Sequence, residues 1–455
     1  MKIKDMIGKS SAKLIFGDIN ADVNFKYFSK DSRTVNFDDV FLGIKGDNFN
    51  GNDYWEEAYR KGASTCILSE DININDYNIK EFTKKNLIVV DNMEEFLVLL
   101  AKPIRSKLNI PIIAVTGSVG KTSTKNIIAD ILETKYKVLK TSGNLNTLIG
   151  LALTLLKVTD EEIAVIEMGM NHAGEISVLS NFLKPDIAVI TNVGTAHIGY
   201  LGSRENILAA KLEILEGLKG PIFINNDNDL LHEWAKNNFH NYQIITYGIE
   251  ELSDYQGKSL KYDKYGSHFQ IQNKSIDINV IGRHFIYNSL IAYAIGDYFH
   301  VDSDSMIQKL ANIPLEKDRM ELIRTAKMTI LNDTYNASYD SVFYALEVLS
   351  CFDGRKIAIL GDIGELGEYS EEIHRKIGPL IIKNNIDILI TVGKFSQYIN
   401  EEAINLGFIK KNSYHLNDKK ETIKLLNEIK KDNDNFLIKA SNSMKFNEIV
   451  DGIKE

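Results

Sequence analysis

IPIIAVTGSVGKTSTKNIIADIL, the segment Ile110–Leu132, decides how the rest of the chain is interpreted. Its apolar run Ile112–Val115 predicts a buried strand, and the turn Thr116–Ser123 holds two glycines and a Lys-Thr pair. An amphipathic helix is predicted next, because the apolar side chains within Ile127–Leu132 recur at helical spacing. Strand, glycine-rich turn and helix start together predict a cradle for a polyphosphate.

Lys121 and Thr122 carry the chemistry expected of this loop. Lys121 would neutralise terminal phosphate oxygens, and the Thr122 hydroxyl would reach Mg²⁺. The full Walker pattern requires a glycine five residues before Gly120, where this chain has Val115, so the textual match is partial. The residues predicted to bind the nucleotide here are Thr116, Gly117, Ser118, Val119, Gly120, Lys121, Thr122 and Ser123.

Composition narrows the class of protein. The chain has 455 residues, which predicts about three domains on a prior of ~150 residues each. A net charge of −9 argues against broad binding to nucleic acid or to an anionic membrane surface. Only two cysteines occur, Cys66 and Cys351, and the chain shows neither a signal-peptide core nor an apolar run of ~18 residues. We therefore expect a reduced, cytoplasmic protein without membrane insertion.

The pattern of apolar runs predicts an α/β fold with three domains, over residues 1–104, 105–314 and 315–455. The first is a small α/β domain. The second has near-continuous apolar strands separated by helices, which predicts a parallel sheet covered on both faces, while alternation within 269–280 predicts antiparallel strands. The third repeats the alternation of strands and helices, which predicts a Rossmann-like sheet. The clearest strand candidates are 65–68, 87–90, 112–115, 163–166, 187–190, 222–224, 244–247, 329–332, 357–360, 388–392 and 436–438.

Three residues beyond the phosphate loop are candidates for its chemistry. Glu167 ends an apolar strand, and at the carboxyl edge of a parallel sheet it would lie beside the loop and supply the hard oxygen ligand that Mg²⁺ prefers; a solvent-facing acid is the alternative. His197 follows the next strand, and its position is equally consistent with a metal ligand and with a structural histidine. Lys211 lies in a predicted helix, 207–218, where an ordinary ammonium would be solvated and would repel a metal.

Other candidate residues lie in the flanking domains. Asn332–Ala337 and Gly361–Gly367 each follow a predicted strand of the third domain, so both should open at the edge where ligands bind in such sheets. Arg319 lies near the predicted domain junction. Ser32 and Arg33 form a turn in the first domain, where a hydroxyl and a guanidinium could grip a phosphate or carboxylate; a simple surface turn explains them as well.

Together these motifs resemble the Mur ligases, the ATP-dependent amide-forming enzymes of peptidoglycan synthesis. The similarity covers all three predicted domains, and the family's phosphate loop has the shorter form Thr-Gly-x-x-Gly-Lys-Thr, so Val115 is no departure from it. The segments that carry the resemblance are Thr116–Thr122, Gly143–Thr147, Glu167–Ile176, Gly282–His284, Asn332–Ala337 and Gly361–Gly367.

The resemblance also implies an activity. The stretches Asn144–Asn146 and Asn171–Ile176 are most similar to family members that join D-alanyl-D-alanine to UDP-N-acetylmuramoyl-tripeptide. Such a member would use ATP and Mg²⁺, form an acyl phosphate and release ADP, and we expect it to be a monomer. Asn442 stands where relatives more often have arginine, and it cannot make an arginine's bidentate contact with a carboxylate.

Site roles follow from the resemblance position by position. His197 matches a position that binds a second Mg²⁺. Lys211 matches the family's carbamylated lysine, whose carbamate oxygens would remove the objection to a lysine beside a metal. The implied metal ligands are thus Thr122, Glu167, His197 and Lys211, and the implied catalytic residues are Lys121, Glu167, His197 and Lys211.

The remaining matches concern the substrates. Positions that match contacts to adenosine or its ribose are Asn288, Arg319, Asp333 and Asn336. Those that match the uridine diphosphate side are Ser32, Arg33, Lys45 and Gly46, and those on the muramoyl-peptide side are Asn144, Asn146 and Thr147. Asp362 and Glu365, with residues 439–447, match the part that receives the dipeptide.

Two other kinds of protein stay open. A different ligase of the same superfamily is one, either a diamino-acid-adding Mur ligase or a folylpolyglutamate synthase, although the Asp-Asn-Pro-Arg segment usual in the former is not found. A nucleotide-dependent switch or motor is the second, but a GTPase should carry Asn-Lys-x-Asp, and the near match Asn273–Ile276 lacks the aspartate. A binding protein that has lost activity would not be expected to retain all the predicted catalytic residues.

Overall fold

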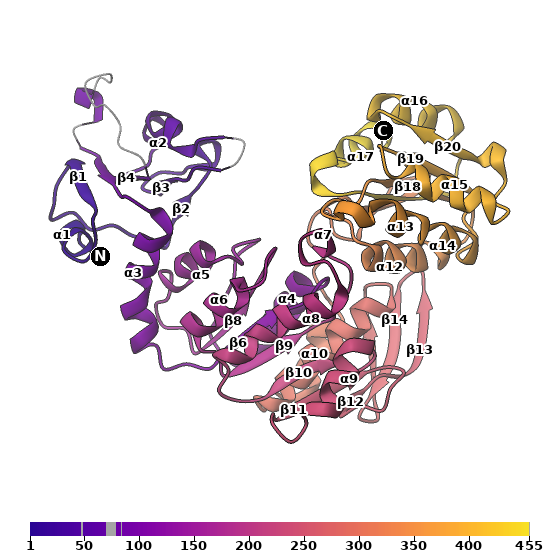
Figure 1. The fold of residues 1–455 in the computed structure, drawn as a ribbon, viewed down its shortest axis with the longest axis horizontal. Helices are drawn as coiled ribbons and strands as arrows, with labels where there is room; N and C mark the ends of the chain where they lie inside the picture. Colours follow the sequence, from indigo (N-terminus) through magenta and orange to yellow (C-terminus); the bar gives the residue numbers. More distant parts are fainter. Residues whose placement is uncertain (47–48, 70–78, 83, 455) are drawn as a thin grey trace. The chain divides into compact units, whose positions relative to one another are not determined.

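The computed structural model describes residues 1–46, 49–69, 79–82 and 84–454 (Figure 1). Contacts divide the chain into two compact units. Unit 1 comprises Met1–Pro111 and Leu139–Ile166, and unit 2 comprises Ile112–Val138 and Glu167–Glu455. The α/β class with parallel sheets is confirmed, while the three-domain division stays a prediction.

Unit 1 is built on a five-stranded sheet with the order β1-β5-β4-β3-β2. Its strands are β1 (Lys13–Phe16), β2 (Phe28–Ser29), β3 (Val40–Gly43), β4 (Thr65–Leu68) and β5 (Asn86–Val89). Only β1 runs antiparallel, against β5, and the other pairs are parallel. Helix α2 (Trp55–Lys61) covers the sheet with buried Trp55 and Tyr59, whose rings meet edge to face at 5.6 Å. Helix α3 (Met93–Lys107) packs against α5 (Leu148–Leu155) in the same unit.

The phosphate-loop segment begins unit 2. Strand β6 (Ile112–Thr116) pairs in parallel with β9 (Ile187–Ile190), which is followed across the sheet by β10 (Ile222–Asn225), β11 (Ile244–Gly248) and β12 (Tyr255–Gln256). All five side chains of β6 are buried, as expected for a parallel strand covered on both faces. Helix α4 (Lys121–Leu132) packs on α10 (Arg283–Tyr298), which fixes the start of α4 against the core.

Two further predictions concern the segment after this sheet. The antiparallel strands predicted within 269–280 are confirmed as β14 (Gly266–Ile271) and β15 (Lys274–Ile278), joined by β13 (Lys258–Asp263). The helix predicted over 207–218 is wrong in its second half. Helix α8 ends at Leu212, because the Glu213 carboxylate accepts the N–H groups of Gly174 and Ser177 and draws the chain into a 3-10 turn.

A six-stranded sheet, β16-β17-β21-β18-β19-β20, forms the last part of unit 2. Its strands are β16 (Glu321–Arg324), β17 (Met328–Asp333), β18 (Lys356–Gly361), β19 (Ile388–Val392), β20 (Ser413–Leu416) and β21 (Asp434–Lys439). The sheet is mixed, because edge strand β16 runs antiparallel to β17. The other pairs are parallel, so β17, β18 and β21 end at one edge and bring Asp333, Gly361 and Lys439 together there.

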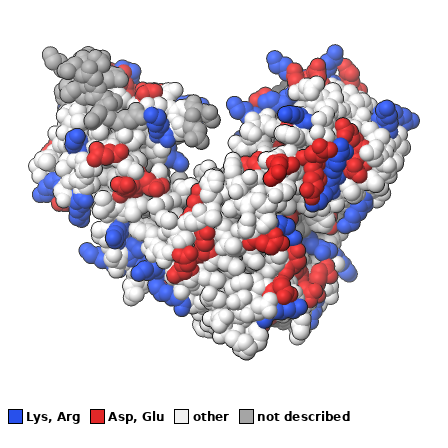
Figure 2. Space-filling model, in the orientation of Figure 1, with Lys and Arg blue, Asp and Glu red and all other residues white. Residues whose placement is uncertain are grey.

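The remaining helices and strands flank or separate these strands along the chain. They are α1 (Ile3–Ile7), β7 (Val138–Lys140), β8 (Ile163–Glu167), α6 (Glu175–Leu183), α7 (Ile198–Leu201), α8 (Arg204–Leu212), α9 (Asp229–Asn238), α11 (Ser303–Leu310), α12 (Tyr339–Ser350), α13 (Ser370–Arg375), α14 (Gly378–Lys383), α15 (Gln397–Asn405), α16 (Lys419–Ile429) and α17 (Asn447–Ile453). Strands β7 and β8 belong to the seven-stranded sheet β12-β11-β10-β9-β6-β8-β7. Among the described residues, no helix has both the length and the apolar character needed to cross a membrane. On the face drawn in Figure 2, Lys and Arg are interspersed with Asp and Glu.

The Arg355–Asp434 ion pair is a buried contact within this last sheet. Arg355 makes two contacts with the Asp434 carboxylate, at 2.8 and 2.7 Å, and the Asp434 side chain is 1% exposed. We expect Arg355→Leu to lower the free energy of unfolding by about 2–4 kcal/mol, because a buried carboxylate loses its partner. Urea denaturation should show this loss, and adding Asp434→Asn should recover part of it. Equal losses in the single and double variants would contradict the explanation.

Candidate functional site

The phosphate loop is formed by a very close approach of two chain segments. Gly117 lies against Thr191, and a Cβ on Gly117 would be 1.9 Å from Thr191 Oγ1. Gly120 caps α4 in the left-handed region, with φ of 80°. Residues Lys121–Ser123 form the first turn of α4, whose N–H groups have no partner within the helix. The loop therefore presents backbone N–H donors and the positive end of a helix to a ligand.

Lys121 lies back over its own loop. Its Nζ donates to Gly117 O at 2.8 Å. Burial lowers the pKa of Lys121, and the charge of Arg319 acts in the same direction, while the carboxylates of Glu167 and Glu365 raise it. Nζ also donates to Ser118 O at 3.4 Å, so the ammonium group is held by two backbone carbonyls of its own loop and feels the charges of two carboxylates.

Glu167 lies beside the loop at the end of β8. The neighbouring Met168 N–H donates to Val115 O at 2.8 Å, and Thr116 Oγ1 donates to Met168 O at 3.0 Å. Glu167 is 3% exposed and Thr122, in the first turn of α4, is 6% exposed. Their oxygens suit Mg²⁺, which usually takes one or two carboxylates together with nucleotide phosphates. Across the described residues, no three His, Cys, Asp or Glu side chains converge as a metal site.

His197 meets a carboxylate from the last sheet of unit 2. Its Nδ1 lies 2.6 Å from Glu365 Oε2. The hydrogen bond from His197 lowers the pKa of Glu365, although partial burial opposes this shift. Both residues have left-handed backbones, with φ of 65° and 61°. Such strain in residues other than glycine is typical of functional sites. The Gly199 N–H also donates to Glu365 O at 3.0 Å, so the two loops are held by backbone as well as side chains.

Lys211 is buried on α8, with 1% of its surface exposed. Burial lowers the pKa of Lys211 well below its ordinary value, and the charge of Lys121 adds to the effect. In the described part of the chain no carboxylate forms an ion pair with Lys211. The structure thus brings Lys121, Glu167, His197 and Lys211 into one unit around the loop, and it favours a neutral amine at Lys211.

Asn288 supports the loop from behind. It is 6% exposed on α10, and its Oδ1 accepts the hydroxyl of Thr124 at 3.0 Å. A Cβ on Gly120 would lie 3.3 Å from the same oxygen. Asn288 is therefore adjacent to the first turn of α4, where a nucleotide would enter.

Arg319 extends from the segment between the two sheets toward the loop. Its guanidinium stacks over the Tyr335 ring at 3.6 Å from the centroid and forms an ion pair with Glu316 at 3.1 Å. Its Nη2 lies 3.5 Å from Thr122 Oγ1. A planar cation held between an aromatic ring and the loop is well placed to meet a phosphate or a base.

Asp333 and Asn336 are joined by a lysine that the sequence analysis did not assign to them. Lys439, whose side chain is 1% exposed, forms an ion pair with Asp333 at 2.5 Å and donates to Asn336 O at 2.8 Å. The other Asp333 oxygen accepts the Met320 N–H at 3.1 Å. Both carboxylate oxygens of Asp333 therefore already have protein partners, and its contact with ribose stays a prediction.

The two residues predicted on the dipeptide side have different surroundings. Asp362 accepts the N–H groups of Lys394, Phe395 and Ser396 at 2.9, 2.9 and 2.7 Å, so its carboxylate holds the turn after β19. Glu365 instead points toward His197. The structure does not bring Asp362 and Glu365 to one point, and their roles toward a dipeptide stay predictions.

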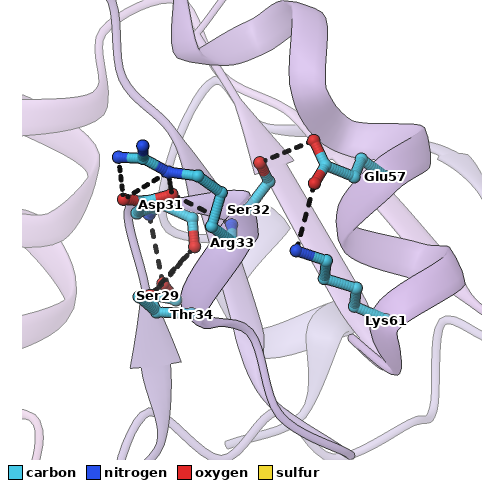
Figure 3. Close-up of polar contacts among 7 residues, drawn as sticks. All are labelled: Ser29, Asp31, Ser32, Arg33, Thr34, Glu57 and Lys61. Carbon is cyan, nitrogen blue, oxygen red and sulfur yellow. Dashed lines mark hydrogen bonds and ion pairs between the residues drawn. The ribbon is translucent and has the colours of Figure 1, made fainter.

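Two of the substrate residues predicted in unit 1, Ser32 and Arg33, already have carboxylate partners (Figure 3). Ser32 Oγ donates to Glu57 at 2.9 Å, and Glu57 also pairs with Lys61 at 3.1 Å. Arg33, with a side chain 80% exposed, pairs with Asp31 at 2.7 Å. A phosphate would have to displace these carboxylates.

Two more predicted stretches lie elsewhere in unit 1. Lys45 forms an isolated bridge with Asn50, and the Gly46 N–H donates to Phe49 O at 2.9 Å. Asn144, Asn146 and Thr147 precede α5, where Thr147 caps the helix by accepting the Gly150 N–H at 3.4 Å. All substrate positions predicted before Ile163 thus belong to unit 1.

Sequence reasoning missed several residues that hold the site. Asp340 Oδ2 accepts the Thr195 N–H at 3.0 Å and so fixes the segment that carries His197. Asn192 contacts the phosphate loop directly. Asn192 had a usable signal, since a polar residue at the carboxyl end of an apolar strand indicates the functional edge of the sheet. No sequence pattern marked Asp340 as part of the site, because it lies at an ordinary helix start, 145 residues away from Thr195.

Comparison with known proteins gives consistent matches along the chain. Family models match in three consecutive parts: the Mur ligase family catalytic domain at residues 26–105, the Mur ligase middle domain at 115–296, and the Mur ligase glutamate ligase domain at 318–442. The UDP-N-acetylmuramoyl-tripeptide–D-alanyl-D-alanine ligase of Bacillus subtilis (strain 168) is 36% identical over 433 residues, which cover 93% of this chain and 92% of that protein.

Solved structures agree with these matches. A crystal structure of MurF from Acinetobacter baumannii aligns with a TM-score of 0.82 at 26% identity and covers 99% of this chain and 98% of that one. MurF ligase from Thermotoga maritima in complex with ADP aligns with a TM-score of 0.77 at 27% identity and covers 95% of this chain and 98% of that one.

Gly117 offers a direct test of the loop geometry. We expect Gly117→Ala to weaken ATP binding by about tenfold or more, because the loop must move away from Thr191 to accept a methyl group. Gly407→Ala is the matched control. Gly407 also has positive φ, 97°, but nothing lies within 4 Å of an added Cβ. Calorimetric titration with ATP should separate the two variants, and equal affinities would show that the close approach is not needed.

Proposed function

Because this chain belongs to the Mur ligase family, we propose that it joins D-alanyl-D-alanine to UDP-N-acetylmuramoyl-tripeptide in an ATP-dependent, ADP-forming reaction of peptidoglycan precursor synthesis. One observation carries the reaction type. Lys121 of the phosphate loop lies within electrostatic range of Glu167, Glu365 and Lys211, an arrangement suited to transferring a phosphoryl group. The choice of substrates is supported by the Bacillus subtilis relative, a UDP-N-acetylmuramoyl-tripeptide–D-alanyl-D-alanine ligase that matches this chain over nearly its whole length.

The first step activates a carboxylate. An oxygen of the tripeptide's terminal carboxylate attacks the γ-phosphorus of ATP, the bond from that phosphorus to the β,γ-bridging oxygen breaks, and ADP leaves. The product is an acyl phosphate, which is needed because a carboxylate is a poor electrophile. Lys121 and the N–H groups at the start of α4 stabilise the charge on the transferring group and on ADP.

The second step forms the amide. The amine of D-alanyl-D-alanine, as the free base, attacks the acyl carbon, and phosphate leaves with its bonding electron pair. The nitrogen then has one proton too many, and the departing phosphate can accept it. No protein nucleophile is required, so the work of the chain is to position three substrates and to exclude water.

Mg²⁺ would be held by Thr122 and Glu167, with His197 and Lys211 serving a second ion. Such ions supply charge stabilisation for phosphoryl transfer. Lys211 fits this role only as a carbamate. Its lowered pKa favours the neutral amine, which can add to CO₂, lose one proton and become an anionic oxygen donor.

The substrates would be bound by the two units. We assign the uridine diphosphate to Ser32, Arg33, Lys45 and Gly46, and the muramoyl peptide to Asn144, Asn146 and Thr147. Adenosine belongs to Asn288, Arg319, Asp333 and Asn336, and the dipeptide to Asp362 and Glu365. We also propose a cytoplasmic monomer without nucleic-acid partners, which its two free cysteines and its acidic charge support.

Phosphate release tests the function. The full chain is mixed with ATP, Mg²⁺, D-alanyl-D-alanine and UDP-muramoyl-tripeptides that differ at the third residue. We expect release only with all components present, and we expect Lys121→Ala to lower it by at least about a thousandfold, since the lysine stabilises the transferring group. The same assay with diamino acids or with folates and glutamate separates the other ligases of the superfamily. Release with one of those sets alone would overturn the assignment.

Lys211 gives a second test. We expect Lys211→Ala to retain the fold and to lose nearly all activity, because the carbamate is missing. A short carboxylic acid should restore part of the rate by supplying the oxygens, and it should leave the wild type unchanged. If Lys211→Ala is fully active, or if no carboxylic acid rescues an inactive Lys211→Ala enzyme, the carbamate assignment is wrong.

A further inference from the structure

Two adjacent polar residues at the end of β9, Thr191 and Asn192, hold the phosphate loop by their side chains. Asn192 Oδ1 accepts the N–H groups of Ser118 and Val119, each at 3.0 Å. Asn192 Nδ2 donates to Val119 O at 3.3 Å, and Thr191 Oγ1 donates to the same carbonyl at 2.7 Å. The peptide groups on both sides of Val119 are therefore held by the neighbouring strand.

This clamp determines which N–H groups remain for a ligand. Those of Ser118 and Val119 point to Asn192, so the donors that face a polyphosphate are those of Gly120 and the first turn of α4. A glycine-containing loop without such contacts would have many conformations, and a ligand would then have to order it on binding. Ordering of this kind reduces affinity.

We propose that Asn192 is a positioning residue that holds the phosphate loop in its nucleotide-binding form before ATP arrives. The inference rests on the proposed use of ATP. Asn192 acts through Ser118 and Val119 and needs no contact with the nucleotide. We therefore expect its effect to fall on the polyphosphate, which the loop would contact, because the side chains of the adenosine positions Asn288 and Arg319 come from other elements and contact α4 rather than Ser118 or Val119.

Asn226 is a matched control on the same sheet edge. It follows β10, the strand next to β9, and it is 7% exposed. Its Nδ2 donates to Leu252 O at 2.9 Å, and its Oδ1 lies 2.9 Å from His232 Nδ1. Asn226 thus has the same side chain and the same kind of buried hydrogen bonds as Asn192, but its partners lie outside the phosphate loop.

Equilibrium binding tests the proposal without turnover. Wild type, Asn192→Ala and Asn226→Ala are titrated calorimetrically with a non-hydrolysable ATP analogue plus Mg²⁺ and, separately, with AMP. We expect Asn192→Ala to bind the ATP analogue about tenfold more weakly and to bind AMP as the wild type does. The Val119 N–H and carbonyl both lose their Asn192 side-chain partner, while the Ser118 N–H keeps only the backbone carbonyl of residue 192, at 3.1 Å. Asn226→Ala should bind both ligands with wild-type affinity.

The other outcomes overturn the proposal. Unchanged binding of the ATP analogue by Asn192→Ala shows that the clamp is not needed. An equal loss for AMP and the ATP analogue shows a general structural role. If Asn192→Ala fails to fold, Thr191→Val is measured instead, because it removes one hydrogen bond to the Val119 carbonyl. We then expect about threefold weaker binding of the ATP analogue and unchanged binding of AMP. Unchanged binding of the ATP analogue by Thr191→Val overturns the proposal. If the wild type binds no ATP analogue, the proposed function itself fails.

Discussion

The contact between Gly117 and Thr191 is the constraint on which the rest of unit 2 depends. Because residue 117 has no side chain, the loop after β6 can lie directly against the segment after β9. That approach allows Gly194 N–H to donate to Ser118 Oγ at 2.9 Å and brings His197 to the same edge of the sheet. A single methyl group at position 117 would separate the phosphate loop from the residues that complete it.

Charge is the second constraint at this edge. Lys121 lies in the loop and Lys211 is close enough to feel its charge. The buried surroundings disfavour the charged form of each lysine, so burial lowers the pKa of both amines. The carboxylates of Glu167 and Glu365 act in the opposite direction and raise the pKa of Lys121. A nucleotide polyphosphate would add negative charge that stabilises the Lys121 ammonium. If Lys211 becomes a carbamate, it adds a negative charge to the site, and cations are then needed to neutralise it.

Residues far apart in the chain complete the site. Glu365 lies in the loop after β18 and Asp340 lies at the start of α12, yet both hold the segment that carries His197. The left-handed backbones at His197 and Glu365 are strained, and packing around Gly199 keeps them in place, because a Cβ on Gly199 would overlap the Glu365 carbonyl. The geometry at His197 therefore depends on its contacts with the loop after β18 and with the start of α12.

The sequence by itself determined the local elements. The runs 112–115 and 187–190 are strands and the alternation near 270 belongs to antiparallel strands, since each pattern depends on neighbours a few residues apart. The Gly-Lys-Thr turn and Glu167, the acid that ends β8, could likewise be placed at one sheet edge by the rules for parallel strands. The early end of α8 could not be predicted from the sequence, because the Glu213 carboxylate accepts hydrogen bonds from residues about forty positions away.

Only the tertiary structure decided which groups meet at the site. The pairing of His197 with Glu365, of Asp333 with Lys439, and of Asn192 with the phosphate loop joins residues that are 73 to 168 positions apart. No short-range pattern encodes such pairs, because each depends on how strand ends and helix starts pack after folding. The physical reason is one of range: periodicity and turn chemistry act over a few residues, whereas side-chain hydrogen bonds form wherever folding brings a donor to an acceptor.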